Sequence, residues 1–289
     1  MKNFIICDGL DCKWGSWINR KYGYPLNTDI FTEPDSCDQF EENIRKLLSF
    51  YQNTELVSMH GPYKDLCMGS KDKLIKAATM QRFQRAYEIA KKINCSNIIL
   101  HHGYIPGTSI PKYWVKRTKN FWDEFLKDKD DNVCYYLENQ FEHSPELLLE
   151  VVNAVNDHRV GICLDVGHAN CNSRTPVMEW ISQCNSKINF VHLHNNNGFQ
   201  DQHLGLDNGT IDFRKICGAL EKYAPDAVWA LEVNSPEDAE QSVRWLMDNG
   251  FLKSSKKPDA RRCGSEENRN SNCGQKNGNL PSGASGYFL

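Results

Sequence analysis

Six short apolar segments of the chain end in a residue that can bind a metal ion or transfer a proton. The segments are VSMH, IILH, YYLE, ICLD, FVH and WALE, and their last residues are His60, His101, Glu138, Asp165, His192 and Glu232. One such residue at the end of a strand is most often a solvated or hydrogen-bonded group without a ligand role. Six in series instead indicate a divalent-metal site, because a cation offsets the repulsion and desolvation of clustered carboxylates.

Imidazole and carboxylate ligands suit Zn²⁺, Mn²⁺ or Co²⁺, and we expect no thiol at an equivalent position. Three further groups follow in loops, namely His168 and the D-x-H pair Asp201 and His203. The pair can direct two side chains at one ion. His194 lies two residues after His192 and has the same strand parity, which favours contact with substrate or solvent over metal binding.

The other histidines and the cysteines have simpler interpretations. His102, His143 and His158 are assigned structural or surface positions. The chain has 12 cysteines without a C-x-x-C pair, and such residues are typical small buried side chains or solvated thiols in a reducing compartment. Cys7 and Cys163 lie in apparent strands, where we assign them to packing rather than to metal ligation.

Short runs rich in Val, Ile and aromatic residues alternate with longer amphipathic stretches, which predicts repeated βα units and a parallel sheet. The eight expected strands are Phe4–Cys7, a weak run at Asp29–Phe31, Leu56–His60, Ile98–His101, Val133–Glu138, Gly161–Asp165, Ile188–His192 and Val228–Glu232. The expected helices are Trp14–Tyr22, Gln39–Tyr51, Lys71–Lys92, Tyr113–Leu126, Pro145–Asn156, Phe213–Tyr223 and Glu237–Met247.

Eight strand–helix pairs in about 250 residues match the length of an α/β fold of the (β/α)₈ TIM barrel type. In that fold the carboxyl ends of all strands lie on one face, so the six terminal residues would converge on one cavity. A doubly wound open sheet is the alternative. No G-x-G-x-x-G segment follows the first strand, which disfavours a dinucleotide-binding sheet.

The composition is that of a globular protein with a large core. The 289 residues include 40% hydrophobic and 25% charged residues, with a formal net charge of −3. This charge disfavours a protein that coats nucleic acid or an anionic membrane. Apolar runs are too short for a bilayer span or a signal peptide, so we expect a cytoplasmic protein.

The composition changes near residue 254. The last 36 residues, 254–289, are rich in Gly, Ser and Asn, and six basic against three acidic residues give them a net charge of +3. The preceding part therefore carries −6. Because this segment has little apolar surface to bury, we predict a flexible tail after a single domain of residues 1–253.

Several motifs resemble the xylose isomerase-like TIM-barrel superfamily, which includes sugar and sugar-phosphate isomerases and epimerases as well as the endonuclease IV group (AP endonuclease family 2). The similar stretches occur in matching order between residues 56 and 250. They are HGPY at 60–63, LHHG at 100–103, LEN at 137–139, LDVGHAN at 164–170, VHLHN at 191–195, DQHLGLDNGTIDF at 201–213 and LEV at 231–233.

The resemblance implies different metal sites in the two branches. In ketose 3-epimerases one divalent ion is held by residues that correspond to Glu138, Asp165, His192 and Glu232. Endonuclease IV adds two zinc ions on residues that correspond to His60, His101, His168, Asp201 and His203. Suitable residues occupy all nine positions. Tyr63 matches a DNA-inserting tyrosine of the nuclease group, but an aromatic residue after HGP also occurs in the isomerase branch.

We therefore expect a metal-dependent sugar or sugar-phosphate isomerase or epimerase that works through an enediolate. Glu138 and Glu232 would move protons, with one Mn²⁺, Zn²⁺, Co²⁺ or Mg²⁺ ion. Tyr63, His194 and Trp14 are the expected substrate contacts, with Trp17 and Trp114 as further apolar walls. One alternative is an endonuclease IV-like phosphodiesterase that acts on abasic DNA with up to three metal ions; nucleic acid is expected as a partner only in this case. The other alternative is a non-catalytic sugar- or metal-binding barrel.

Overall fold

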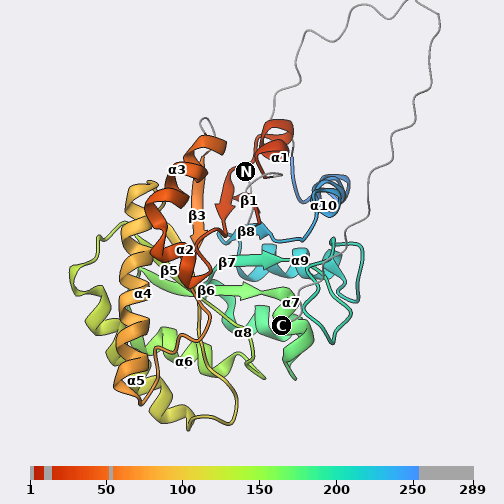
Figure 1. Ribbon diagram of the computed structural model, residues 1–289. Coiled ribbons are helices and arrows are strands. Elements are labelled where there is room, and N and C mark those ends of the chain that lie inside the picture. Colours follow the sequence, from red (N-terminus) through yellow and green to blue (C-terminus); the bar gives the residue numbers. More distant parts are fainter. Residues whose placement is uncertain (1–2, 10–14, 52–54, 254–289) are drawn as a thin grey trace, which may run out of the picture. The chain divides into compact units, whose positions relative to one another are not determined.

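The computed structural model describes residues 3–9, 15–51 and 55–253. Its eight parallel strands form a closed barrel in which neighbouring strands follow one another in sequence (Figure 1). The strands are β1 (Phe4–Cys7), β2 (Leu26–Thr28), β3 (Leu56–His60), β4 (Asn97–His101), β5 (Cys134–Glu138), β6 (Val160–Asp165), β7 (Ile188–Leu193) and β8 (Val228–Leu231). The prediction of a TIM barrel is confirmed, and the open sheet is excluded. Trp14 and the predicted tail at 254–289 lie outside the described residues.

Helices surround the strands, as Figure 1 shows. They are α1 (Gly15–Tyr22), α2 (Pro34–Asp38), α3 (Phe40–Phe50), α4 (Lys73–Lys92), α5 (Pro111–Phe125), α6 (Glu146–Val155), α7 (Val166–Asn172), α8 (Val177–Cys184), α9 (Phe213–Tyr223) and α10 (Pro236–Asp248). Short 3₁₀ turns follow α5 (Leu126–Asp128) and α8 (Asn185–Lys187). Within the described ranges, no helix is both long enough and apolar enough to cross a bilayer.

Local sequence explains several helix starts. The Asp72 side chain accepts hydrogen bonds from the first amides of α4, and Ser235 does the same for α10. These caps satisfy donors that have no partner within the helix. Asp165 caps α7 in the same way by accepting from the His168 amide at 2.6 Å. One candidate ligand therefore fixes the start of the helix that carries another.

The strand register brings the candidate residues together. His101 pairs with Glu138 between β4 and β5, and Asp165 pairs with His192 between β6 and β7. Below them, a small apolar cluster fills the barrel interior; its buried members are Ile5, Cys7, Ile99, Cys163, Phe190 and Ala230. The polar ends of the strands thus rest on a packed apolar layer, as expected for a barrel of eight strands.

The second strand differs from the prediction. It spans Leu26–Thr28 rather than Asp29–Phe31, because Asn27 and Thr28 pair with Ser58 and Met59 of β3. The polar Asn27 is tolerated inside the barrel because it accepts a hydrogen bond from the Ser58 hydroxyl at 2.7 Å. Asp29 consequently follows the strand, at the same end as the other candidate residues. Helices α2, α7 and α8 were not predicted.

Candidate active site

A cavity of about 330 Å³ opens at the carboxyl ends of the strands. Seven of the nine predicted ligands line it, namely His60, His101, Glu138, His168, Asp201, His203 and Glu232. The other two, Asp165 and His192, are fully buried and contact those residues directly. The structure thus brings all nine predicted residues together at one end of the barrel.

Glu138 lies at the centre of this group. Its Oε2 atom lies 3.1 Å from His60 Nε2 and 3.5 Å from His101 Nε2, and its Oε1 atom lies 3.3 Å from Nδ1 of both His168 and His192. Burial alone would raise the pKa of Glu138. The charges of His192 and His101 and the hydrogen bond from His168 outweigh burial and hold this pKa well below its usual range.

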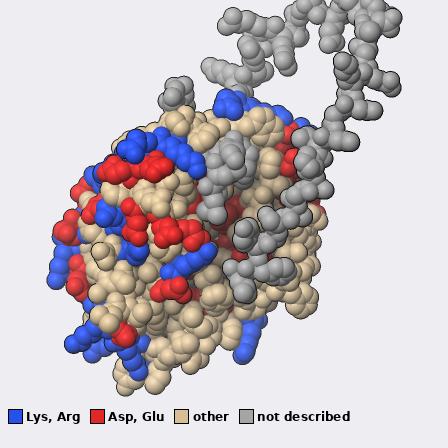
Figure 2. Space-filling view, viewed as in Figure 1, with Lys and Arg blue, Asp and Glu red and all other residues tan. Residues whose placement is uncertain are grey.

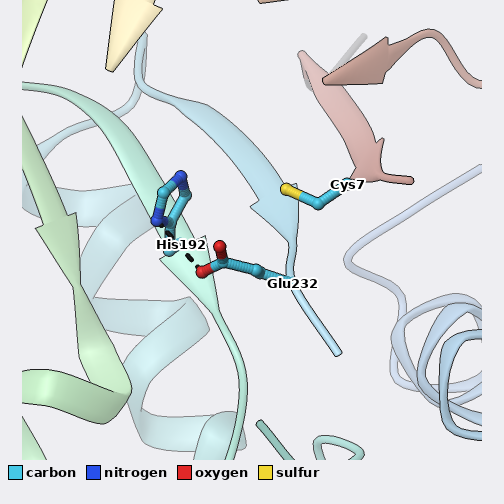
Figure 3. A group of neighbouring side chains, drawn as sticks. All are labelled: Cys7, His192 and Glu232. Carbon is cyan, nitrogen blue, oxygen red and sulfur yellow. Dashed lines mark ion pairs between the residues drawn. The ribbon is translucent and has the colours of Figure 1, made fainter. Parts of the chain in front are cut away.

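His192 lies among three carboxylates. Its Nδ1 atom is 3.1 Å from Glu232 Oε2 (Figure 3). The same atom is 3.6 Å from Asp165 Oδ2. Burial opposes the charged forms of all these groups, but their mutual attraction outweighs it. As a result the pKa of Glu232 falls to about 2, the pKa of Asp165 also falls, and the pKa of His192 rises well above its usual range.

Another carboxylate, Asp201, lies between His168 of α7 and His203 of the segment that follows β7. Its Oδ2 atom lies 3.0 Å from His168 Nε2 and 3.1 Å from His203 Nε2. Burial would lower the pKa of His203, yet its hydrogen bond with Asp201 and the Glu232 charge raise the pKa to about 9. The backbone φ of His203 is +49°, a left-handed conformation that ordinarily costs free energy and is concentrated at functional sites.

Four histidines share an orientation that suits metal binding. In each ring Nδ1 lies near a backbone carbonyl or side-chain amide oxygen, and Nε2 lies near the Glu138 or Asp201 carboxylate. The Nδ1 partners are Gly61 O for His60, Gln140 Oε1 for His101, Asn139 O for His168 and Glu232 O for His203, at 2.8–3.1 Å. Metal-bound histidines use the second nitrogen in this way, which fixes the ring and leaves the first nitrogen available to the ion.

The donor set therefore fits divalent metal. Among the described residues, ligand atoms lie within 4.8 Å of one another in the group His60, His101 and Glu138, and in the group His168, Asp201 and His203. The buried His192 provides a further sign, because neither of its ring nitrogens has a hydrogen-bond partner. Buried polar groups in folded proteins are rarely left in this state, and a bound cation would give such a nitrogen a partner.

The residues predicted to contact substrate lie in different places relative to the cavity. Tyr63 lines the cavity and stacks on His101 with ring centroids 4.1 Å apart. His194 does not reach the cavity: it is fully buried, and its Nε2 lies 3.0–3.1 Å from both Asp165 oxygens. β7 extends to Leu193, and the His194 ring that follows it lies against the Asp165 side chain. Trp17 and Trp114 are also not among the residues that line the cavity.

Cys7 and Asp29 are among the cavity residues that were not predicted as site residues. Cys7 ends β1 and lies near His192 and Glu232, so the expectation of no thiol at an equivalent position is wrong. The signal was present, since FIIC ends in a ligand-type residue just as the other strands do. Asp29 also lines the cavity, and burial together with the Glu232 charge raises its pKa to about 6. Its position at the cavity was not predicted because the second strand was expected at Asp29–Phe31.

His102 has the structural role expected from its parity. It is fully buried, its Nδ1 lies 2.8 Å from Glu142 Oε1, and its Nε2 accepts a hydrogen bond from Trp114 Nε1 at 3.0 Å. The other Glu142 oxygen accepts a hydrogen bond from the backbone amide of Gln140 at 2.7 Å, and the side chain of Gln140 in turn contacts His101. This network supports the cavity from outside.

A closed barrel of eight parallel strands with a cluster of histidines and carboxylates at its carboxyl ends defines a TIM-barrel protein with a metal-type site. Residues 24–249 match the family described as xylose isomerase-like TIM barrel, and the chain belongs to this family.

The chain is also similar to individual known proteins. The protein MJ1311 of Methanocaldococcus jannaschii is 27% identical over 223 residues, which cover 72% of this chain and 74% of the relative. A crystal structure described as a D-tagatose 3-epimerase-like protein superposes with a TM-score of 0.69 at 24% identity, covering 86% of this chain and 97% of that one. A zinc-bound IOLI protein gives a TM-score of 0.67 at 17% identity, with 86% and 96% coverage.

Proposed function

We propose that the protein is a metal-dependent isomerase or epimerase that acts on a small sugar. The observation that carries the proposal is the position of Glu138 and Glu232, two carboxyl groups that both line the cavity and both approach Nδ1 of His192, at 3.3 and 3.1 Å. Two carboxylates around one small cavity can remove a proton from a substrate carbon and return one. The similarity to an epimerase-like structure supports this class.

The residues that would hold the ion are Glu138, Asp165, His192 and Glu232. A bound divalent ion would supply Lewis-acid polarisation of a substrate oxygen. The low pKa values of Glu138 and Glu232 keep both side chains as carboxylates, the form that accepts a proton from the carbon next to a carbonyl. Transfer of that proton to one glutamate gives an enediolate, and its return from the same glutamate to the neighbouring carbon completes an isomerisation. An epimerisation instead requires the other glutamate to take a proton from solvent and donate it to the opposite face of the enediolate.

The cavity favours an uncharged sugar over a sugar phosphate. Lys64 is the single Lys or Arg among the described residues that line it, and its Nζ already pairs with Glu33 Oε1 at 2.5 Å. Phosphate binding ordinarily uses charge-assisted hydrogen bonds from several cationic or backbone donors. The volume of about 330 Å³ also lies at the small end of the range for ligand pockets.

The test combines metal analysis with exchange of solvent hydrogen. The purified protein is analysed for metal content and incubated with a panel of ketohexoses in D₂O, and deuterium at the substrate carbons is followed by NMR. We expect incorporation by the wild type and a loss of about 10²–10⁴-fold in Glu138→Gln and Glu232→Gln. Glu142→Gln is the matched control, because Glu142 is a buried carboxylate that does not line the cavity.

Full exchange in either cavity variant would refute the acid–base roles of these glutamates. Sugar binding without exchange in the wild type would instead support a non-catalytic binding barrel.

A second candidate function follows from the His60–His101 and His168–His203 pairs, each of which directs two Nε2 atoms to one carboxylate. Three metal ions held by all nine residues would suit a phosphodiesterase of the endonuclease IV type acting on abasic DNA. Against it, Lys and Arg side chains are interspersed with Asp and Glu on the face drawn in Figure 2, without a continuous basic surface. Three zinc ions per chain and cleavage of an abasic duplex would favour this candidate.

A further inference from the structure

Cys7 lies at the end of β1, with its side chain directed toward Glu232 and His192 (Figure 3). One ligand atom from each of the three residues lies within 4.8 Å of the other two. Cys7 also lines the cavity, although only 1% of its surface is exposed. A thiol is therefore positioned where a small ion in the cavity would meet it.

The two neighbours of Cys7 have unused binding capacity. Both ring nitrogens of the fully buried His192 lack a hydrogen-bond partner, and so does Glu232 Oε2. The carboxylate contacts of His192 lie at ion-pair distance without forming a hydrogen bond of good geometry. A cation within reach of Cys7 Sγ, His192 and Glu232 would satisfy all three groups at once.

We propose that Cys7 is a thiolate ligand of the cavity ion, together with His192 and Glu232. The proposal rests on the metal site of the proposed function and names the class of ion: thiophilic Zn²⁺, Co²⁺ or Cd²⁺ rather than Mg²⁺ or Mn²⁺, because thiolates select soft and borderline cations. In the binding step the S–H bond breaks, the Sγ–metal bond forms, and the proton passes to solvent. No electron is transferred.

Cys163 is the rival thiol, because its ligand atom lies in a similar group with Glu138 and His192. It belongs to the fully buried middle of β6 and is not among the described residues that line the cavity. An ion that enters through the cavity therefore meets Cys7 first. Cys184 on α8 offers a matched control, because it is an equally buried thiol on an outer helix.

The experiment uses Co²⁺ as the probe. Full-length protein is stripped of metal and titrated with Co²⁺ while the near-ultraviolet sulfur-to-cobalt charge-transfer band is recorded. We expect the band in the wild type, in Cys184→Ser and in Cys163→Ser, and its loss in Cys7→Ser, which retains bound Co²⁺ and its visible d–d bands. Persistence of the band in Cys7→Ser with loss in Cys163→Ser would overturn the proposal.

Affinity gives a second measurement. Removal of a residue that only hydrogen-bonds to a metal ligand typically weakens metal binding by about 10–100-fold. Because Cys7 would bind the ion directly, Cys7→Ser is expected to weaken Cd²⁺ binding by at least that much. Mg²⁺ binding should be unchanged. Co²⁺ bound to the wild type without a charge-transfer band would overturn the role of Cys7 alone. A wild type that binds no Co²⁺ would overturn the metal site of the proposed function as well.

Discussion

Two buried histidine–carboxylate clusters lie close together in this barrel, and they differ in how their polar atoms are used. In the His102 cluster both ring nitrogens have partners, Glu142 and Trp114. In the His192 cluster the ring lies among Glu138, Asp165 and Glu232, yet neither nitrogen makes a hydrogen bond. The two histidines are equally buried, so burial does not distinguish them.

The difference separates a structural cluster from a binding cluster. A fully bonded network stabilises the fold and has no capacity left for a ligand. A buried network with unused nitrogens and an excess of carboxylates is costly unless a cation completes it. The following predictions change one cluster at a time.

The largest effect is expected for metal binding. His192→Asn removes a ring that approaches three carboxylates, so we expect metal affinity to fall by more than about 100-fold. This exceeds the loss caused by removing a residue that only hydrogen-bonds to a metal ligand. His102→Asn should retain the metal, since His102 contacts Glu142 and Trp114 outside the cavity. Isothermal titration calorimetry with Zn²⁺ measures both. Equal losses in the two variants would remove the distinction between the clusters.

A smaller loss of affinity is expected at His194, which does not line the cavity but holds Asp165 through Nε2. His194→Phe retains the ring shape and removes the donor, and metal affinity should fall by about 10–100-fold. His194→Gln can donate a hydrogen bond again and should recover part of the affinity. A loss that His194→Gln does not recover would indicate that packing against Gly167, where a Cβ atom would lie 1.9 Å from the His194 ring, is the dominant contribution.

Stability should respond in the other cluster. Glu142→Gln leaves one acceptor where two are used, by His102 and by the Gln140 amide. One buried donor then lacks a partner, which costs about 1–3 kcal/mol of the free energy of unfolding. Urea denaturation of the metal-free protein measures this cost, with Glu124→Gln on the exposed surface of α5 as a control. Unchanged stability together with lost metal would contradict the structural role.

The sequence predicted the parts that repeat along the chain. Buried parallel strands have continuous apolar sequences, so their carboxyl-terminal residues could be aligned without coordinates, and the structure brings Glu138, Asp165 and His192 together as that alignment required. Helices α4 and α9 were similarly apparent from their periodicity.

Other features depended on tertiary contacts. β2 is a three-residue strand whose polar Asn27 is stabilised by Ser58 of β3, a contact that local sequence does not reveal. His194 follows the parity of the strand, but its contact with Asp165 across β6 and β7 is a tertiary contact that local sequence does not reveal. Cys7 was visible at the end of its strand, yet only the structure shows that its thiol lies near His192 and Glu232.

An effect of similar size, confined to part of the pH range, concerns the pH dependence of stability at Asp29. Burial and the Glu232 charge raise the pKa of Asp29 to about 6, against about 3.9 in an unfolded chain. Between these values the folded state binds more protons, so this group lowers the stability of the metal-free protein as pH rises from about 4 to 6. The free energy of unfolding of Asp29→Asn should therefore match that of the wild type near pH 4 and exceed it by about 1–3 kcal/mol at pH 7, as measured by urea denaturation with a chelator present.

The histidines with raised pKa values lose their contribution to stability only above about pH 6.5. The difference between the stability curves of the two proteins from pH 4 to 6 therefore isolates Asp29. Parallel curves would show that Asp29 keeps an ordinary pKa and that the anionic cluster does not extend from Glu232 to β2.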